Sequence, residues 1–219
     1  MIICIYAAAS DKIDKKYIKD VEHLGEELAK NGNGLIYGAG ATGLMGAAAR
    51  GFRAADGQVI GVTPKFMEDI EPTFGDCTEL IFTDTMADRK EIMENGADAF
   101  LIVPGGIGTF DEFFQCITLR ELDQHDKPII IYNFDNYYTK LIEYMEDCID
   151  KGFIRERVRD FYNVATTAKE AVDIVDNLSK TVKKNNEIGK FAQDTLSNKE
   201  VKTTSKPQNM YECDDVLDL

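Results

Sequence analysis

Short apolar runs alternate with longer segments that carry the apolar spacing of helices, and this alternation constrains the fold more than any other feature. The apolar runs are IICIYA (2–7), GLIYG (34–38), QVIGVTP (58–64), ELIFTD (79–84), AFLIVPG (99–105), PIIIYN (128–133) and NVATT (163–167). Helical spacing falls at residues 14–30, 43–55, 86–96, 109–122, 137–151 and 168–180. Strands alternating with helices indicate a parallel sheet covered on both faces. The sequence therefore predicts an α/β fold with a doubly wound, Rossmann-like sheet.

The alternation also divides the chain. Residues 1–180 have the length and hydrophobic content of one nucleotide-binding catalytic domain, out of 219 residues in total. Residues 181–219 are polar and rich in Lys, Asn, Thr and Ser, which predicts a partly helical or mobile tail. A docked tail that uses Tyr211, Val216 and Leu217 is the alternative.

Net charge and cysteine content limit which ligands, metal sites and cellular compartments are compatible with the chain. The formal net charge of -14 opposes binding to nucleic acid and to anionic membrane surfaces, so a phosphate-bearing ligand needs a local site. The five cysteines are scattered without a C-x-x-C pair, which favours the cytoplasm over a disulfide framework or a zinc site. Two histidines without metal-ligand spacing predict no metal site. No apolar run reaches the length of a membrane span.

In a doubly wound sheet, ligands bind beyond the carboxyl ends of the strands. The first motif at such a position is YGAGATGLMGAAARG (37–51), in which Gly38, Gly40 and Gly43 give G-x-G-x-x-G. This spacing occurs in dinucleotide sites, but here it follows the second strand and the next strand ends without an acid for a ribose. A tight turn for helix packing and one wall of a nucleotide pocket are the other two interpretations.

The second motif is MADRK (86–90), which places Arg89 and Lys90 near a helix start. A cation gains nothing from the helix dipole at that end. Pairing of Arg89 with Asp88 or Glu91 on a solvated face is the simplest explanation from this segment alone.

The third motif is VPGGIGTFDEFF (103–114). Gly105, Gly106 and Gly108 expose backbone amides before a helix, an arrangement that binds phosphate. Thr109 suits the N-cap, and Thr109 with Glu112 spells a capping box, which is the purely structural alternative. Capping alone does not require three glycines.

These motifs together resemble those of a known family. PGGIGTFDE (104–112) matches the P-G-G-x-G-T-x-x-E signature of the Lonely guy family of cytokinin-activating phosphoribohydrolases, often labelled lysine decarboxylases. MADRK is similar to its M-x-x-R-K element, YGAGATGLMG (37–46) resembles its Y-G-G-G-x-x-G-L-M-G, and TLRELDQHDKPIIIYN (118–133) resembles its segment ending H-x-K-P. The resemblance covers residues 3 to about 180, in the family's order and spacing.

The resemblance implies a hydrolase that cuts the N-glycosidic bond of AMP or an N6-modified AMP and needs no cofactor. Arg89 and Glu112 are the implied catalytic pair. The implied substrate-binding residues are Glu71, Arg89, Lys90, Gly105, Gly106, Ile107, Gly108, Thr109, Phe110, Asp111, Glu112 and Thr118, with Ser10, Gly38, Gly40, Gly43 and Met86 on the pocket wall. The family's C-G-S-S reads Ala-Ala-Ala-Ser at 7–10, and Ala39 replaces the middle glycine of G-G-G, which leaves the contacts of the first loop open.

Two other functions fit the same fold. A non-catalytic nucleotide carrier, similar to molybdenum-cofactor carrier proteins, would not need Arg89 and Glu112 together. A pyridoxal-dependent decarboxylase would need a cofactor motif that the sequence lacks.

The assembly is predicted to be a homodimer. The helices that carry EFFQCITLRELDQ and GLMGAAARGFRAA have more apolar surface than one sheet face covers. Family members associate in this way, and Arg120, Glu121 and His125 lie in a segment near that contact, where we expect structural or interface roles.

Overall fold

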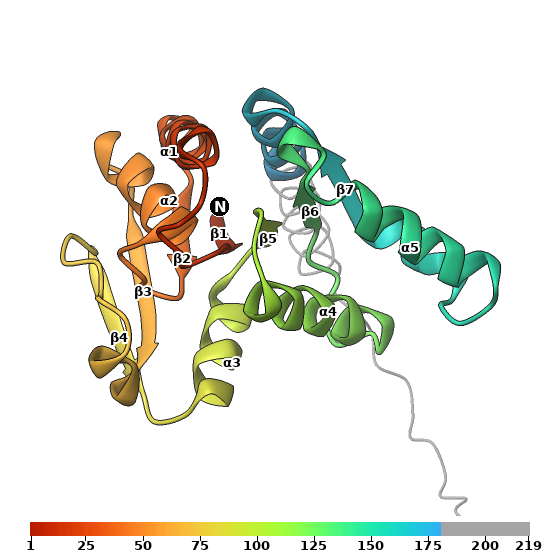
Figure 1. Cartoon of the computed structure of the whole chain (residues 1–219), viewed down its shortest axis with the longest axis horizontal. Coiled ribbons are helices and arrows are strands. Elements are labelled where there is room, and N and C mark those ends of the chain that lie inside the picture. Colours follow the sequence, from red (N-terminus) through yellow and green to blue (C-terminus); the bar gives the residue numbers. More distant parts are fainter. Residues whose placement is uncertain (181–219) are drawn as a thin grey trace, which may run out of the picture. The chain divides into compact units, whose positions relative to one another are not determined.

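Residues 1–180 are built around a single parallel sheet, as the alternation predicts (Figure 1). The structure is a computed structural model, and it describes residues 1–180. The strand order is β4-β3-β2-β1-β5-β6-β7, and every neighbouring pair is parallel. The strands are β1 (Ile2–Tyr6), β2 (Gly34–Tyr37), β3 (Val59–Pro64), β4 (Glu79–Thr83), β5 (Ala99–Ile102), β6 (Ile129–Tyr132) and β7 (Tyr162–Ala165).

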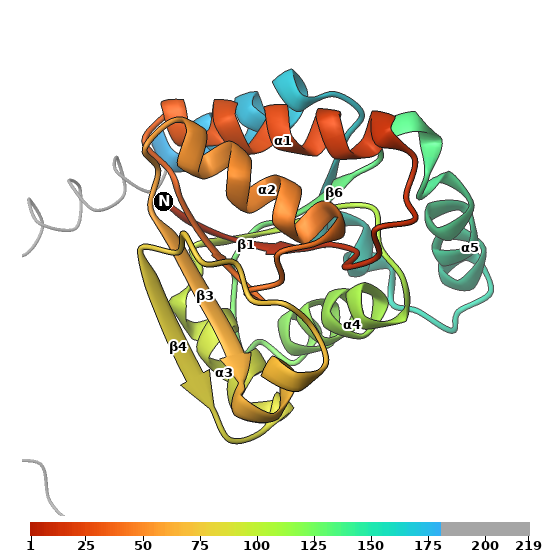
Figure 2. The same ribbon diagram turned by 60° about the vertical axis from the view of Figure 1, so that its left-hand side comes forward.

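Helices cover both faces of this sheet (Figure 2). They are α1 (Lys15–Lys30), α2 (Gly43–Ala54), α3 (Met86–Gly96), α4 (Ile107–Glu121), α5 (Thr139–Asp150) and a helical segment at 168–180. In β1, Ile3 and Ile5 pack toward α1 and α2, whereas Cys4 and Tyr6 pack toward α3 and α4. The doubly wound, Rossmann-like class is therefore confirmed.

Most element boundaries agree with the predicted ranges to within two residues. The helix after the third motif begins at Ile107, two residues earlier than expected. Three short 3-10 helices were not expected: η1 (Lys65–Asp69), η2 (Phe134–Asn136) and η3 (Glu156–Phe161). The predictions for the tail at 181–219 lie outside the described residues.

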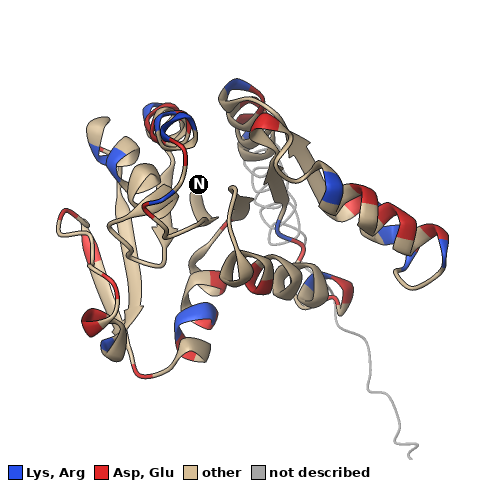
Figure 3. Ribbon diagram, in the orientation of Figure 1, with Lys and Arg blue, Asp and Glu red and all other residues tan. Residues whose placement is uncertain are grey.

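The strand order reverses at β1, because β2 lies on one side of it and β5 on the other. The connections after β1 and β5 leave toward opposite faces, which opens a crevice at their carboxyl ends. Figure 3 shows that β1, β5 and β6 carry no charged residue. Charged groups of a site in this crevice must therefore come from the connections and helices. Within residues 1–180, no helix combines the length and the apolar character required to cross a bilayer.

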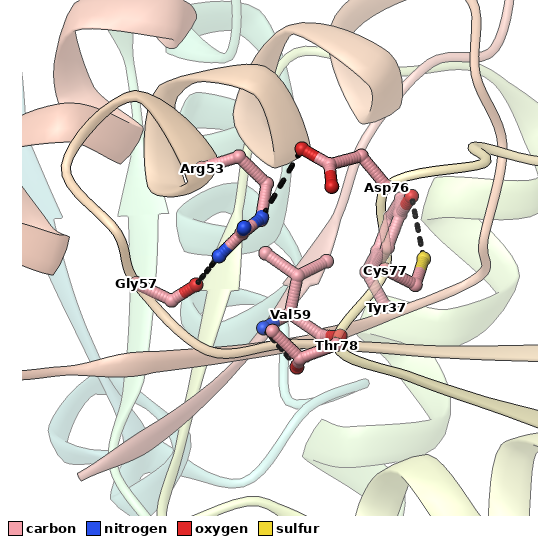
Figure 4. Close-up of polar contacts among 7 residues, drawn as sticks. All are labelled: Tyr37, Arg53, Gly57, Val59, Asp76, Cys77 and Thr78. Atoms are coloured by element: carbon pink, nitrogen blue, oxygen red, sulfur yellow. Dashed lines mark hydrogen bonds and ion pairs between the residues drawn. The ribbon is translucent and has the colours of Figure 1, made fainter.

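The connection from β3 to β4 forms one wall of that crevice and is tied at its base (Figure 4). Arg53, at the end of α2, donates to the carbonyl of Gly57 at 3.0 Å and to Asp76 at 3.2 Å. The hydroxyl of Thr78 bonds both the amide and the carbonyl of Val59, at 2.9 and 2.8 Å. These bonds tie the C-terminal end of the connection that carries η1 and Glu71 to the start of β3.

Helix α2 lies almost entirely inside the chain, which corrects the expectation that it offers spare apolar surface for a dimer. Its apolar residues are buried against the sheet and against α1. Glycines permit this approach: a Cβ at Gly51 would lie 2.0 Å from the carbonyl oxygen of Glu22, and one at Gly25 would lie 2.6 Å from that of Ala48. The sequence did not reveal that α1 covers this surface.

We expect Gly51→Ala to lower the free energy of unfolding by about 1–3 kcal/mol, because backbone of α1 occupies the space of the added methyl. Urea titration followed by circular dichroism measures this change. Gly75→Ala is the control, since no atom lies within 4 Å of its Cβ position. Equal stability of the two variants would contradict the close α1–α2 contact.

Candidate active site

A cleft of about 300 Å³ lies at the point where the strand order reverses. Its walls come from the loop after β1, the start of α2, η1 and the residues after it, α3, and the start of α4. The lining residues are Ala7, Ala8, Ala9, Ser10, Met45, Met67, Glu71, Arg89, Gly106, Gly108, Thr109 and Glu112. All three motifs therefore contribute to one cleft.

The floor of the cleft is the beginning of α4, which starts differently from the expected capping arrangement. Gly106 is the N-cap and no side chain caps the helix. The predicted N-cap at Thr109 and its capping box with Glu112 are therefore wrong. The helix starts earlier, so Thr109 lies inside its first turn and packs under Gly105, where a Cβ would lie 2.1 Å from the threonine hydroxyl.

Starting the helix at glycine leaves its amides accessible. The first N–H groups of a helix have no acceptor within the helix. Cβ positions at Gly106 and Gly108 face open space, with no atom within 4 Å. The first turn of α4 contains no acidic residue. Bare amides and the positive end of the helix dipole thus make this floor suitable for an anion such as phosphate.

Glu112 lies further along α4 and is nearly withdrawn from water. Its side chain is 12% exposed, and its Oε1 lies 3.8 Å from a terminal nitrogen of Arg89, whose side chain is 10% exposed. Burial raises the pKa of Glu112 to about 7, although the positive charge of Arg89 lowers it. A carboxyl group with this pKa in a cleft is characteristic of a reacting group.

Arg89 is held by backbone, which corrects the expectation that it pairs with Asp88 or Glu91 on a solvated face. Its Nε donates to the carbonyl of Val62 at 3.1 Å. Its guanidinium lies over Gly38, where a Cβ would be only 1.6 Å from a terminal nitrogen. Asp88 instead forms a capping box with Thr85. Gly38, in the first motif, therefore creates the space for the arginine of the second.

The amides at the start of α2 are already occupied. Leu44 and Met45 donate to the carbonyl of Ala8 at 2.8 and 3.2 Å, and the Thr42 hydroxyl donates to that of Ala9 at 2.7 Å. A pyrophosphate therefore lacks the donors that it uses in a dinucleotide site. The first motif acts through packing: it holds the loop after β1 and leaves room for Arg89.

A second carboxyl group, Glu71, contacts the same cleft. Its Oε1 is buried and has no hydrogen-bond partner within residues 1–180, and it approaches Gly40 so closely that a Cβ there would lie 2.5 Å away. Burial raises the pKa of Glu71, while Arg89 lowers it. Lys90 and Asp111 do not line the cleft, and the Nζ of Lys90 bonds the carboxylate of Asp111 at 3.0 Å.

Several predicted residues lie elsewhere. Thr118 is exposed, and it lies nine positions after Thr109 in α4, about 14 Å along the helix axis. Met86 and Gly43 do not line the cleft, Ile107 is exposed and Phe110 is half-buried. The sequence did not single out Met45 and Met67 as lining residues, and Met67 lies in a 3-10 helix without a periodic pattern.

The residues expected near a subunit contact have structural partners inside the chain. Arg120 donates to the carbonyls of Lys127 and Phe161 at 2.9 and 2.8 Å. His125 bonds the carbonyl of Cys116 at 3.0 Å, and Glu121 pairs with Arg155 at 3.4 Å. Among residues 1–180, no group of three or more His, Cys, Asp or Glu side chains could hold a metal ion.

Comparisons with known proteins give one family. The family model described as "Possible lysine decarboxylase" matches residues 45–175. A cytokinin riboside 5'-monophosphate phosphoribohydrolase of Arabidopsis thaliana is 34% identical over 170 residues, which are 78% of this chain and 75% of the relative. One of Mycobacterium tuberculosis is 36% identical over 176 residues, or 80% of this chain and 88% of the relative.

Solved structures show the same fold. The molybdenum cofactor carrier protein of Chlamydomonas reinhardtii superposes with a TM-score of 0.63 at 21% identity, covering 82% of this chain and 98% of the carrier. A likeness at this identity concerns the fold alone.

The raised pKa of Glu112 predicts a gain in stability when its charge is removed. The folded pKa lies above the unfolded value of 4.5, so ionisation of Glu112 destabilises the fold as pH rises between these values. We expect Glu112→Gln to raise the free energy of unfolding by about 2–3 kcal/mol at pH 8 and by only a few tenths at pH 4.5. Urea titrations of both proteins at each pH measure this difference. A gain that does not depend on pH would contradict the buried, ionising carboxyl group.

Proposed function

The chain belongs to the Lonely guy family of phosphoribohydrolases, and from that premise we propose that it hydrolyses the N-glycosidic bond of AMP or an N6-modified AMP. The products are the free base and ribose 5-phosphate. The observation that carries this proposal is the buried pair of Glu112 and Arg89, which lies one to two turns beyond the uncapped start of α4. Residues 1–180 supply every group that the proposal uses.

The 5'-phosphate binds at the floor of the cleft in this proposal. The amides of Gly106 to Thr109 donate to its oxygens, and the helix dipole favours its charge. The phosphate is remote from the bond that breaks, so its binding energy orients the sugar. Nucleoside monophosphates are therefore preferred over nucleosides.

Glu112 faces the anomeric carbon of a sugar anchored in this way. Departure of the base leaves positive charge on the sugar, and a nearly buried carboxylate such as that of Glu112 stabilises this charge more strongly than one in water. The same carboxylate accepts a hydrogen bond from the attacking water and orients it. A pKa of about 7 lets Glu112 accept a proton from this water near neutral pH.

Arg89 offsets the charge that flows into the departing base. Its guanidinium donates to the Val62 carbonyl at 3.1 Å and lies over Gly38, where no side chain occupies the space. A guanidinium carries a delocalised positive charge and several donors in a fixed plane, which suits it to a planar ring. One of its terminal nitrogens lies 3.8 Å from Oε1 of Glu112, and Arg89 lines the cleft. Glu71, whose Oε1 lacks a partner within residues 1–180, supplies a further polar contact to the substrate.

A non-catalytic carrier on the same fold is the alternative. Its support is the likeness to the carrier of Chlamydomonas reinhardtii, which concerns the fold alone. A carrier has no use for a carboxyl group kept near neutral pKa beside a fixed cation. The pair of Glu112 and Arg89 therefore favours the enzyme.

We also propose that the protein forms a homodimer through α4. Ile107, Phe114 and Leu122 are 84%, 40% and 61% exposed, and their spacing places them with Thr118 along one side of this helix. A second copy that covers this side would bury apolar surface and would bring its own groups near the start of α4. The free thiols of Cys4 and Cys116 suit the cytoplasm.

Base release tests the proposed function directly. We expect purified protein to release adenine from AMP, or the modified base from N6-isopentenyl-AMP, as measured by liquid chromatography. Glu112→Gln should lower kcat by about 10² to 10³, because an electrostatic contribution to the transition state is lost. Absence of base release from every purine and pyrimidine monophosphate would contradict the proposal, as would wild-type kcat in the variant.

Gly38→Ala should lower kcat by a similar factor of about 10², although this residue offers no chemical group, because the methyl displaces the guanidinium of Arg89. Gly75→Ala is the matched control and should keep wild-type kcat. Full activity of Gly38→Ala would show that Arg89 is not needed where the structure places it.

Light scattering at micromolar concentration tests the assembly. We expect the mass of a dimer for the wild-type chain, and a monomer for Phe114→Glu, since a buried charge without a partner disfavours the contact. A wild-type monomer would contradict the proposed dimer.

A further inference from the structure

Two adjacent tyrosines, in the segment after β6, reach back to the glycine loop. The hydroxyl of Tyr137 donates to the carbonyl of Gly105 at 2.8 Å, and that of Tyr138 donates to the carbonyl of Val103 at 2.8 Å. Their rings meet edge to face, with centroids 4.9 Å apart. The two hydroxyls therefore hold the carbonyls on either side of Pro104, where the loop leaves β5.

The backbone that presents these tyrosines is held in an unfavourable conformation. Asp135 and Asn136 have φ values of 53° and 58°, in the left-handed region. Surrounding contacts enforce this turn: Asp135 accepts hydrogen bonds from Lys16 and Tyr17, and the side chain of Asn133 accepts one from the amide of Tyr138 at 2.7 Å. Strained backbone of this kind is maintained where its geometry matters.

The bond to Gly105 also sets the direction of a donor in the cleft. The carbonyl of Gly105 and the N–H of Gly106 belong to one planar trans peptide, so they point in opposite directions. Fixing the carbonyl toward Tyr137 therefore fixes the N–H away from it. Because glycine is flexible, the loop itself does not enforce this orientation.

A cavity beside the loop gives the hydrogen bond from Tyr137 to Gly105 a consequence for the position of the loop. An apolar cavity of about 140 Å³ lies there, lined among others by Ile13, Tyr17, Leu44, Gly105, Gly106 and Tyr137. The loop has room to relax into this cavity. Tyr137 connects the loop to helix α1: its hydroxyl bonds Gly105, and its ring contacts the Tyr17 ring edge to face with centroids 6.2 Å apart.

We propose that Tyr137 is a positioning residue for phosphate binding: its hydroxyl fixes the Gly105–Gly106 peptide so that the loop's amides face the cleft. This inference rests on the proposed function in placing a phosphate at the start of α4. Tyr137 does not line the cleft, so in this proposal it acts through the backbone of the loop. Tyr138 secures the end of β5, from which the loop departs.

Calorimetric titration with ribose 5-phosphate tests this role without requiring turnover. We expect Tyr137→Phe to raise the dissociation constant for ribose 5-phosphate by about three- to tenfold, which is the usual effect of losing one neutral hydrogen bond. The ring and its packing remain. Binding of adenine, which has no phosphate, should change by less than about twofold, and the KM for AMP should rise with kcat nearly unchanged.

Tyr17→Phe is the matched control. Tyr17 lines the same cavity, but its hydroxyl bonds Asp135 at 3.0 Å and not the loop, and Lys16 still holds Asp135 at 2.6 Å when this hydroxyl is removed. Its affinity for ribose 5-phosphate should stay within about twofold of wild type. Unchanged affinity in Tyr137→Phe, an equal loss in Tyr17→Phe, or an equal loss for adenine and ribose 5-phosphate would overturn the inference.

This outcome is separable from that of the proposed function. A wild-type protein that binds ribose 5-phosphate more tightly than Tyr137→Phe, yet releases no base, would refute the hydrolase and support the positioning role. If the wild-type protein releases base and Tyr137→Phe has the same KM for AMP, the result would support the hydrolase and refute the positioning role. Failure of wild type to bind ribose 5-phosphate would overturn the positioning role.

Discussion

The account depends on a carboxyl group that is kept out of water beside one fixed cation. Glu112 and Arg89 are both nearly buried and lie 3.8 Å apart, which is too long for a close ion pair. The pKa of Glu112 is therefore raised by burial more than the arginine lowers it. Gly38, the Val62 carbonyl and the early start of α4 all serve to maintain this arrangement. Burying an ionisable carboxyl group lowers the stability of the fold. A role in a reaction therefore explains Glu112 better than a role in folding does.

Binding and reaction are assigned to different parts of the chain. Backbone amides at the start of α4 offer an anion site that needs no side chain, and so it can exist in a protein with a net charge of -14. In the proposed reaction, side chains from α3 and α4 supply the reacting groups. The apolar strands contribute only position, because the reversal of strand order at β1 brings these connections together.

The sequence predicted the sheet, its helices and many residues of the cleft, but it did not predict which side chains contact one another. Alternating apolar runs reflect burial on both faces of the sheet, so the strands were recoverable from local pattern. The T-x-x-E at Thr109 fits a capping box equally well in sequence, and only the helix start at Ile107 decides against it. The burial of Arg89 over Gly38 joins residues far apart in the chain, so neither local segment reveals it. The packing of α1 over α2 and the hydrogen bond from Tyr137 to Gly105 also join residues that are distant in the chain.

The most direct test of the central claim is a crystal structure of Glu112→Gln with AMP bound. The variant keeps the shape of the side chain and slows hydrolysis, so the intact nucleotide can be observed. The account predicts phosphate oxygens within hydrogen-bond distance of the amides of Gly106 to Thr109, with the anomeric carbon facing residue 112 and the base near Arg89. A phosphate bound elsewhere, with residue 112 turned away from the sugar, would contradict it.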